Sequence, residues 1–324
     1  MKKPIWRGLT ATMAFLLILS IATMACSLQY AGSINSYFGF SPASEITLSN
    51  DGENIFTSEF GGFDEEGQKK LVEATKQQNI REAEEGSVLL RNEGKALPLT
   101  EAERSITIFG RASVDPVYKN HSSGNTPTEK DAVTLKMALE EQGFKINETV
   151  WNAYAASGIT RDINVGNIGE VPADFYTADI QASWDADYHD AALIFLTREC
   201  GEGNDLFISD AEGISELALH DSERAMVEMV TSSGKFGKVI AVLNTPTPME
   251  LGWLEEYGVD ACLWIGTPGR DGFTGIVNLI TGKANPSGRL VDIYAANSLS
   301  APAVIGSATE TPTYVVSAQQ MPFF

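Results

Sequence analysis

The stretch DAALIFLTRECGEGNDLFISD, residues 190–210, decides the fold. Its apolar part, Ala191 to Leu196, is a short uninterrupted run of the kind that forms a strand buried on both faces of a parallel sheet. The run stops at the polar residues 197–199, and a glycine-containing loop follows. Ligands of open α/β sheets bind beyond the carboxyl ends of the strands. We therefore expect the loop after this strand to border a ligand-binding crevice.

One acidic residue in this loop stands between two glycines. Gly201 and Gly203 flank Glu202. Glycine accepts backbone dihedral angles that are closed to other residues, and it lets a bulky ligand approach the chain. This arrangement favours Glu202 as a carboxylate that is presented to a ligand. The alternative is an ordinary acidic surface turn, because a glycine-acid-glycine tripeptide is by itself a weak signal.

Strands and helices alternate along the rest of the chain. Further strands are predicted at residues 105–110, 144–149, 238–243 and 259–265. Helices are predicted at residues 64–85, at 131–142 with Asp131 as the N-cap, at 222–232 and at 273–280. The alternation predicts an α/β fold, a sandwich of a mostly parallel β-sheet flanked by helices. Aromatic residues between Trp151 and His189 could form a sugar-stacking surface, but their irregular spacing favours a place in the core.

Composition excludes several classes of function. The chain has 324 residues and a formal net charge of −20, which argues against nucleic acid as a partner. Its three cysteines, Cys26, Cys200 and Cys262, are too scattered for a disulfide framework or a zinc site. His121 has no second histidine nearby, so we interpret it as an ordinary loop residue. We expect no metal and no cofactor.

The amino terminus has the pattern of a membrane-targeting segment. Lys2, Lys3 and Arg7 precede an uncharged run from residue 8 to residue 32. This run is long enough for a transmembrane helix, which requires about 20 residues. A retained anchor, a cleaved signal and a lipoprotein site at Cys26 are the alternatives, and we favour the anchor. The positive-inside rule then places the chain after about Ser33 outside the cytoplasm, at the cell surface.

Three motifs, in the same order, resemble the carboxyl-terminal α/β sandwich domain of glycoside hydrolase family 3. The segment SVLLRNEGKALPL, residues 87–99, resembles the start of that domain, and CGEGND, residues 200–205, resembles its acid/base loop, with Cys200 in place of the usual small residue. The segment GKANPSGRL, residues 282–290, is similar to the closing turn of the domain. There we expect Pro286 to fix its φ angle and Gly288 to supply an unusual dihedral angle before a last strand.

The resemblance implies a β-glucosidase-like O-glycosyl hydrolase of carbohydrate metabolism. Glu202 would be its general acid/base, and Ser123 and Gly124 would lie in a turn that lines the sugar pocket. The substrate would be a β-linked glucoside or oligosaccharide. In this family the nucleophilic aspartate belongs to a β/α barrel domain, and nothing in this sequence resembles that barrel. We therefore interpret the chain as the leading part of an enzyme of reversed domain order, inactive when isolated.

These expectations divide the chain into four parts. Residues 1–32 are a membrane anchor or signal segment, and residues 33–80 are a spacer with a leading helix. Residues 81–302 are the family 3 sandwich domain, and residues 303–324 are a linker or truncated tail. The alternative function is that of a non-catalytic, membrane-anchored domain that binds carbohydrate or acts as a scaffold. A dinucleotide-binding fold is disfavoured, because Gly110-Arg111-Ala112 lacks the GxGxxG pattern.

Overall fold

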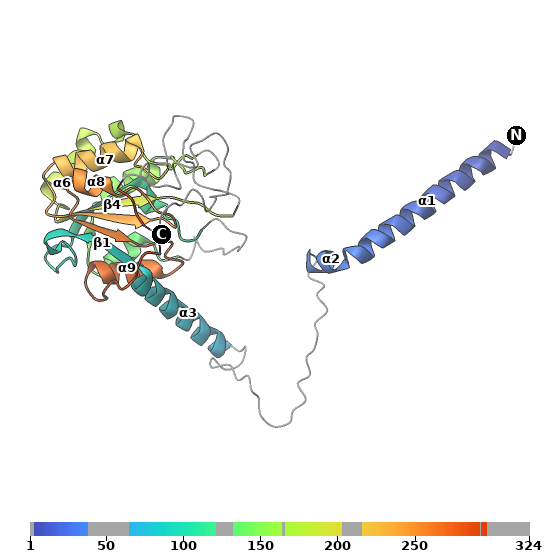
Figure 1. Cartoon of the computed structure of the whole chain (residues 1–324), viewed down its shortest axis with the longest axis horizontal. Coiled ribbons are helices and arrows are strands. Elements are labelled where there is room, and N and C mark those ends of the chain that lie inside the picture. Colours follow the sequence, from blue (N-terminus) through green and yellow to red (C-terminus); the bar gives the residue numbers. More distant parts are fainter. Residues whose placement is uncertain are drawn as a thin grey trace, which may run out of the picture. The chain divides into compact units, whose positions relative to one another are not determined.

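The computed structural model describes residues 3–37, 65–120, 132–163, 166–202, 216–291 and 293–296. The chain divides into two compact units, Met1–Glu59 and Phe60–Phe324. The first unit contains helix α1 (Lys3–Gln29) and helix α2 (Ala31–Tyr37) (Figure 1). α1 is long and apolar enough to cross a membrane, a criterion that a signal sequence near the N-terminus meets equally. α2 begins in the last two residues of the predicted anchor and continues into the predicted spacer, residues 33–80.

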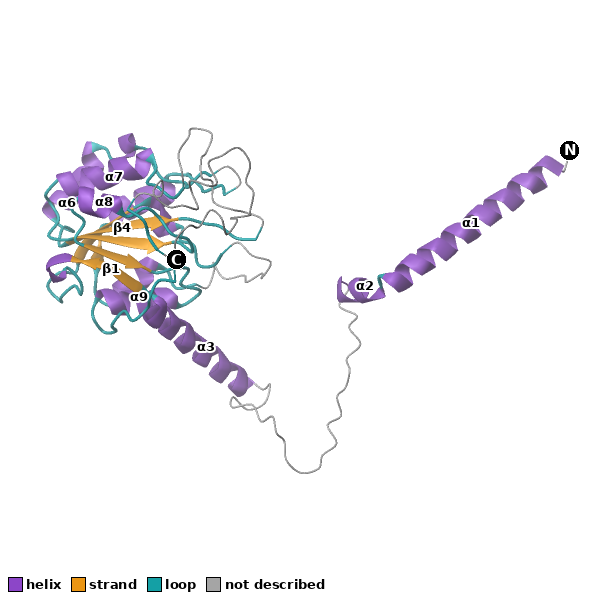
Figure 2. Cartoon of the chain, viewed as in Figure 1, coloured by secondary structure: helices purple, strands orange, loops and turns teal. Residues whose placement is uncertain are grey.

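A six-stranded sheet forms the centre of the second unit (Figure 2). One edge strand runs antiparallel to its neighbour, and every other neighbouring pair is parallel. The α/β fold class is therefore confirmed, with a mostly parallel sheet flanked by helices. The spatial order of the strands is β1 (Val88–Asn92), β6 (Ala261–Trp264), β5 (Val239–Asn244), β4 (Ala191–Thr197), β2 (Ser105–Phe109) and β3 (Lys145–Ile146).

Helices cover both faces of the sheet. Successive side chains of each strand point to opposite faces, so the apolar strands present side chains to a core on each side. In β4, Leu193 and Phe195 enter one core and Ile194 and Leu196 enter the other. The first core packs against α3 (Glu65–Gly86), α4 (Leu135–Glu141) and α9 (Gly272–Ile280). The second packs against α5 (Glu148–Ala156), α6 (Ala178–Ala186), α7 (Asp221–Ser232) and α8 (Gly252–Glu256). Three short 3-10 helices, η1 (Glu93–Lys95), η2 (Arg111–Val114) and η3 (Ala173–Phe175), complete the described elements.

Full burial explains why β4 is apolar without interruption. Every residue of this strand is buried, and burying one large aliphatic or aromatic side chain contributes about 1.5–3 kcal/mol. The aromatic residues of the following segment also belong to the core. Tyr154, Tyr176 and Trp184 are buried in the second core, and the hydroxyl groups of Tyr154 and Tyr176 are 2.6 Å apart. The preference for a core over a sugar-stacking surface is confirmed for these three residues.

Local capping moves two element boundaries away from their predicted positions. α4 begins at Leu135, because the side chain of Thr134 accepts a hydrogen bond from the backbone N–H of Met137. Asp131, the predicted cap, lies outside the described residues. The strand predicted at residues 144–149 is only Lys145–Ile146, because the side chain of Asn147 caps helix α5.

Gly288 is required for a different reason from the one that we predicted. Its φ angle is outside the positive region, but an added Cβ would lie 2.4 Å from the carbonyl oxygen of Gly86. The N–H of Gly288 donates a hydrogen bond of 3.1 Å to the carbonyl of Ser87. The glycine therefore permits a close approach of two backbone segments. No strand follows it among residues 289–291 and 293–296.

Candidate active site

The carboxyl ends of β2, β4, β5 and β6 lie at one edge of the sheet, which we call the carboxyl edge, because these four strands are parallel. Each strand there gives way to a loop or a 3-10 helix that begins at residue 110, 198, 245 or 265. Ligand sites of open α/β sheets are found at such edges. Glu202 belongs to the loop that follows β4, so the way in which the loops of this edge are held together bears on its position.

A buried asparagine fixes three of these loops to one another. Asn244, the last residue of β5, is completely buried. Its Oδ1 accepts a hydrogen bond of 2.7 Å from the N–H of Val117, and its Nδ2 donates to the carbonyls of Val117 (2.9 Å) and Gly266 (2.7 Å). The loops that follow β2, β5 and β6 are thereby joined through one side chain.

Glycine is essential where β2 ends. Gly110 has a φ angle of +94°, and an added Cβ would lie 2.1 Å from the carbonyl oxygen of Phe195 in β4. Its N–H donates a hydrogen bond of 3.0 Å to the hydroxyl of Tyr154. The chain can therefore turn from β2 into η2 directly against β4 only because no side chain is present.

A network of charged residues connects the loop after β2 with the end of β4. The Nη2 atom of Arg161 lies 3.5 Å from a carboxylate oxygen of Asp115, and its Nε lies 3.4 Å from a carboxylate oxygen of Glu199. Asp115 also pairs with Arg111 at 2.9 Å. The side chain of Arg161 is only 12% exposed, whereas that of Asp115 is 43% exposed, so the guanidinium is shielded from water and its partner carboxylate is half-buried. Sequence reasoning missed Arg161, because no local pattern distinguishes it from a surface residue.

Glu202 lies close in sequence to this network, shortly after Glu199. It is an exposed residue in a turn three positions beyond Glu199. Glu202 is therefore five residues beyond the end of β4, on the loop that leaves the carboxyl edge. The remainder of the predicted loop motif, from Gly203 to Asp205, lies outside the described residues, as do Ser123 and Gly124. The described residues contain no group of three or more His, Cys, Asp and Glu side chains that could hold a metal ion.

Glu170 is a second carboxylate near this edge, and its burial changes its pKa. Burial raises the pKa of Glu170 to about 7, although the backbone N–H groups of Val171 and Arg111 and the charge of Arg111 partly oppose the shift. The N–H of Arg111 lies 3.1 and 3.0 Å from its two carboxylate oxygens. Glu170 therefore binds a proton more tightly in the folded chain than in the unfolded one.

We expect the stability of the second unit to fall as pH rises from about 4.5 to about 7, because over this range the unfolded chain releases the proton of Glu170 while the folded chain still holds it. The loss should be about 1–3 kcal/mol, since one pKa unit corresponds to about 1.4 kcal/mol. Urea unfolding of the Glu170→Gln variant across this range should show a flatter dependence on pH.

Glu103→Gln is the matched control for this measurement. The pKa of Glu103 is lowered to about 2, chiefly by its hydrogen bond with Lys238, so its contribution changes only below about pH 4.5. An unchanged slope in Glu170→Gln, or an equal flattening in Glu103→Gln, would show that Glu170 does not carry the effect.

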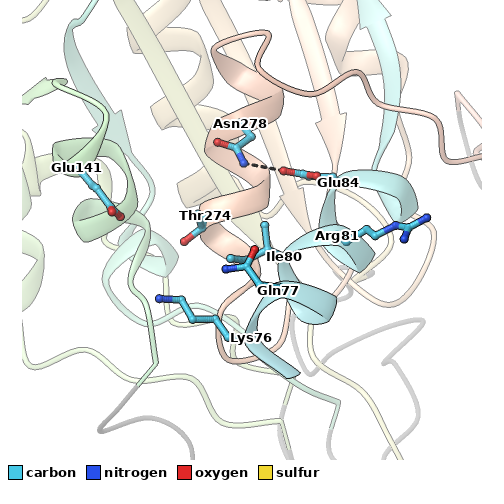
Figure 3. Close-up of a pocket in the computed structure, with 8 residues that line it drawn as sticks. All are labelled: Lys76, Gln77, Ile80, Arg81, Glu84, Glu141, Thr274 and Asn278. Atoms are coloured by element: carbon cyan, nitrogen blue, oxygen red, sulfur yellow. Dashed lines mark hydrogen bonds between the residues drawn. The ribbon is translucent and has the colours of Figure 1, made fainter. Parts of the chain in front are cut away.

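Two of the open pockets among the described residues adjoin helix α3. One has a volume of about 480 Å³ between α3 and α9 and is lined by charges of both signs, including Lys76, Arg81 and Glu141; within it Asn278 donates a hydrogen bond of 2.6 Å to Glu84 (Figure 3). The other, of about 490 Å³, lies where β6 ends and is lined in part by Tyr118 and Trp264. The second pocket lies at the carboxyl edge.

Comparison with known proteins agrees with this architecture. Residues 87–318 match the sequence model of the glycosyl hydrolase family 3 C-terminal domain. A beta-glucosidase of Ruminococcus albus is 29% identical over 220 residues, covering 65% of this chain and 22% of the relative. A beta-glucosidase of Pyricularia oryzae is 30% identical over 224 residues, covering 68% of this chain and 29% of the relative. The chain thus spans less than a third of the length of either relative.

Solved structures show the same fold. A beta-glucosidase from Thermotoga neapolitana in complex with glucose matches with a TM-score of 0.59 and 24% identity, covering 76% of this chain and 33% of that one. A beta-glucosidase from Paenibacillus barengoltzii matches with a TM-score of 0.57 and 24% identity, covering 70% of this chain and 25% of that one. Because the family match extends over well more than half of the sequence, this chain belongs to glycosyl hydrolase family 3 and carries its C-terminal domain.

Proposed function

We propose that this chain supplies the general acid/base of a β-glucosidase-type glycosidase and that Glu202 is the carboxylate. The observation that carries the proposal is the position of Glu202, exposed in a turn at the carboxyl edge immediately after the buried strand β4. The two relatives described above are both beta-glucosidases, which supports a β-linked glucoside or oligosaccharide as the substrate. Ser123 and Gly124 are proposed to contribute to the sugar pocket.

The chemistry requires a second carboxylate. In a retaining glycosidase the general acid protonates the leaving oxygen while a nucleophilic carboxylate, about 5–5.5 Å away, attacks the sugar. The acid/base residue then removes a proton from the water that releases the sugar. We propose that the nucleophile comes from a family 3 barrel domain outside this sequence. An exposed Glu202 suits this arrangement, because its carboxylate is accessible to a substrate held by another domain.

A complementation assay tests the proposal. The second unit alone, from residue 60 onward, should fold and should not hydrolyse an aryl β-glucoside. Joined to a family 3 barrel domain, it should restore turnover, whereas the barrel domain alone should not. Appreciable turnover by this chain alone would show that no barrel is needed. Glucose binding without turnover in the joined protein would instead favour a carbohydrate-binding role.

We also propose that α1 is retained as a transmembrane anchor, with the second unit outside the cytoplasm. The apolar helix Lys3–Gln29 and the basic residues at its start support this orientation. The full chain should stay in the membrane fraction after washing with high salt and should keep its amino terminus. Protease added to intact cells should cleave the second unit. A soluble product that begins near Ser27 would contradict retention of the anchor.

A further inference from the structure

A completely buried arginine lies next to the segment that carries Glu202. Arg198 is the first residue after β4, and its side chain is 0% exposed. Its Nη1 and Nη2 atoms each lie 2.8 Å from a different carboxylate oxygen of Glu223, in the first turn of α7. Glu223 is also buried, with a side chain that is 3% exposed. The two residues therefore form a bidentate ion pair inside the protein.

The same guanidinium group holds backbone on both sides of the Glu202 segment. Its Nη1 donates a hydrogen bond of 2.7 Å to the carbonyl of Thr197, where β4 ends. Its Nη2 donates at 2.7 Å to the carbonyl of Ala218, and its Nε donates to the carbonyl of Glu216. A guanidinium has five N–H donors, so all of them are used. Arg198 thus joins the end of β4 to residues 216–218, which precede helix α7.

Other contacts hold the returning segment in place. The carbonyl of Leu217 accepts a hydrogen bond of 2.7 Å from the N–H of Glu250, in the loop that follows β5. The N–H of His220 donates at 3.0 Å to Glu223, as part of the capping box of α7. Glu223 therefore accepts from Arg198 and also fixes the start of the helix. On the outgoing side, Glu199 is held by Arg161.

We propose that Arg198 and Glu223 are positioning residues for Glu202. This inference rests on the proposed function of Glu202. Burying an ion pair requires the removal of two charges from water, and such pairs are often no more stabilising than apolar side chains of similar volume. A rigid, fully hydrogen-bonded arginine does, however, fix the direction of the chain at the end of β4. A misplacement of about 1 Å at a reacting group can lower a rate by about 10²-fold.

The test uses Glu223→Gln in the full chain joined to a family 3 barrel domain. The amide keeps the volume of Glu223 but cannot form the bidentate ion pair. Hydrolysis of cellobiose, whose leaving group requires protonation, should fall by about 10-fold to 10²-fold. Formation of the glycosyl-enzyme from dinitrophenyl glucoside, whose leaving group requires none, should change by less than about 3-fold. Glu103→Gln is the control, because it removes an ion pair with Lys238, outside the carboxyl edge.

A second variant covers the case in which Glu223→Gln does not fold. The double replacement of Arg198→Met with Glu223→Met removes both charges and should give the same preference for the activated substrate, since it removes the contacts to Thr197, Glu216 and Ala218. Equal slowing of both substrates, or rates like those of the unaltered protein, would overturn the positioning role. Glu202→Gln, measured alongside, separates the two proposals: if it shows no leaving-group preference, the proposed function itself is wrong.

Discussion

Glu202→Gln is expected to slow the hydrolysis of an alkyl glucoside or cellobiose by about 10²–10⁴-fold in the chain joined to a family 3 barrel domain, because general-acid assistance has this magnitude. Formation of the glycosyl-enzyme from dinitrophenyl glucoside should be much less affected, since that leaving group departs without a proton. Steady-state kinetics with cellobiose and burst kinetics with dinitrophenyl glucoside measure the two effects separately. The contrast between the substrates excludes general damage to the fold, which would lower both rates together.

Glu199 is the matched control for this prediction. It lies three residues before Glu202, but its carboxylate already pairs with Arg161 at 3.4 Å, whereas Glu202 lies in an exposed turn. Glu199→Gln should therefore show a much weaker preference for the activated substrate than Glu202→Gln, because it can act only through the position of the segment. If Glu199→Gln shows the leaving-group pattern and Glu202→Gln slows both substrates equally, the acid/base is Glu199.

Gly110→Ala should destabilise the second unit by more than about 3 kcal/mol, because it adds backbone strain to overpacking. The new Cβ would lie 2.1 Å from the carbonyl oxygen of Phe195, and the φ angle of +94° is unfavourable for alanine. The close contact with Phe195 cannot relax without moving β2 or β4. Urea unfolding followed by circular dichroism measures the loss.

Gly258→Ala provides the comparison for Gly110→Ala. Gly258 also has a positive φ angle, +66°, but an added Cβ would meet no atom within 4 Å. Its replacement should therefore cost only about 1 kcal/mol, the strain of the left-handed conformation alone. A loss at Gly110 no larger than that at Gly258 would contradict the close approach of β2 and β4.

The core of the fold could be predicted from the sequence, because burial on both faces leaves a strong local pattern. The apolar run of β4 and the periodic segment of α9 were both predicted to within a residue or two. The boundary near Asn147 was wrong, since an asparagine can continue a strand or cap a helix and only the tertiary structure decides. Gly288 was expected to supply an unusual dihedral angle, but what requires glycine there is the close approach to the backbone of Gly86, which leaves no distinct sequence signal.

The candidate site could be predicted only in part. Glu202 was found because its position between two glycines is a local feature. Arg161 and Glu223 could not be found in this way, since their partners Asp115 and Arg198 lie far from them in the sequence. Such contacts depend on which loops meet at the carboxyl edge. The order of the strands in the sheet determines which loops meet, and no single segment of the sequence encodes that order.

Rescue by azide tests the assignment of Glu202 most directly. In Glu202→Ala joined to a family 3 barrel domain, dinitrophenyl glucoside should still form the glycosyl-enzyme, but water should release the sugar slowly because no base activates it. Azide needs no base and can occupy the space left by the carboxylate, so it should accelerate turnover and give β-glucosyl azide. The account predicts this product for Glu202→Ala and not for Glu199→Ala. No acceleration by azide in Glu202→Ala, with β-glucosyl azide formed by Glu199→Ala, would contradict it.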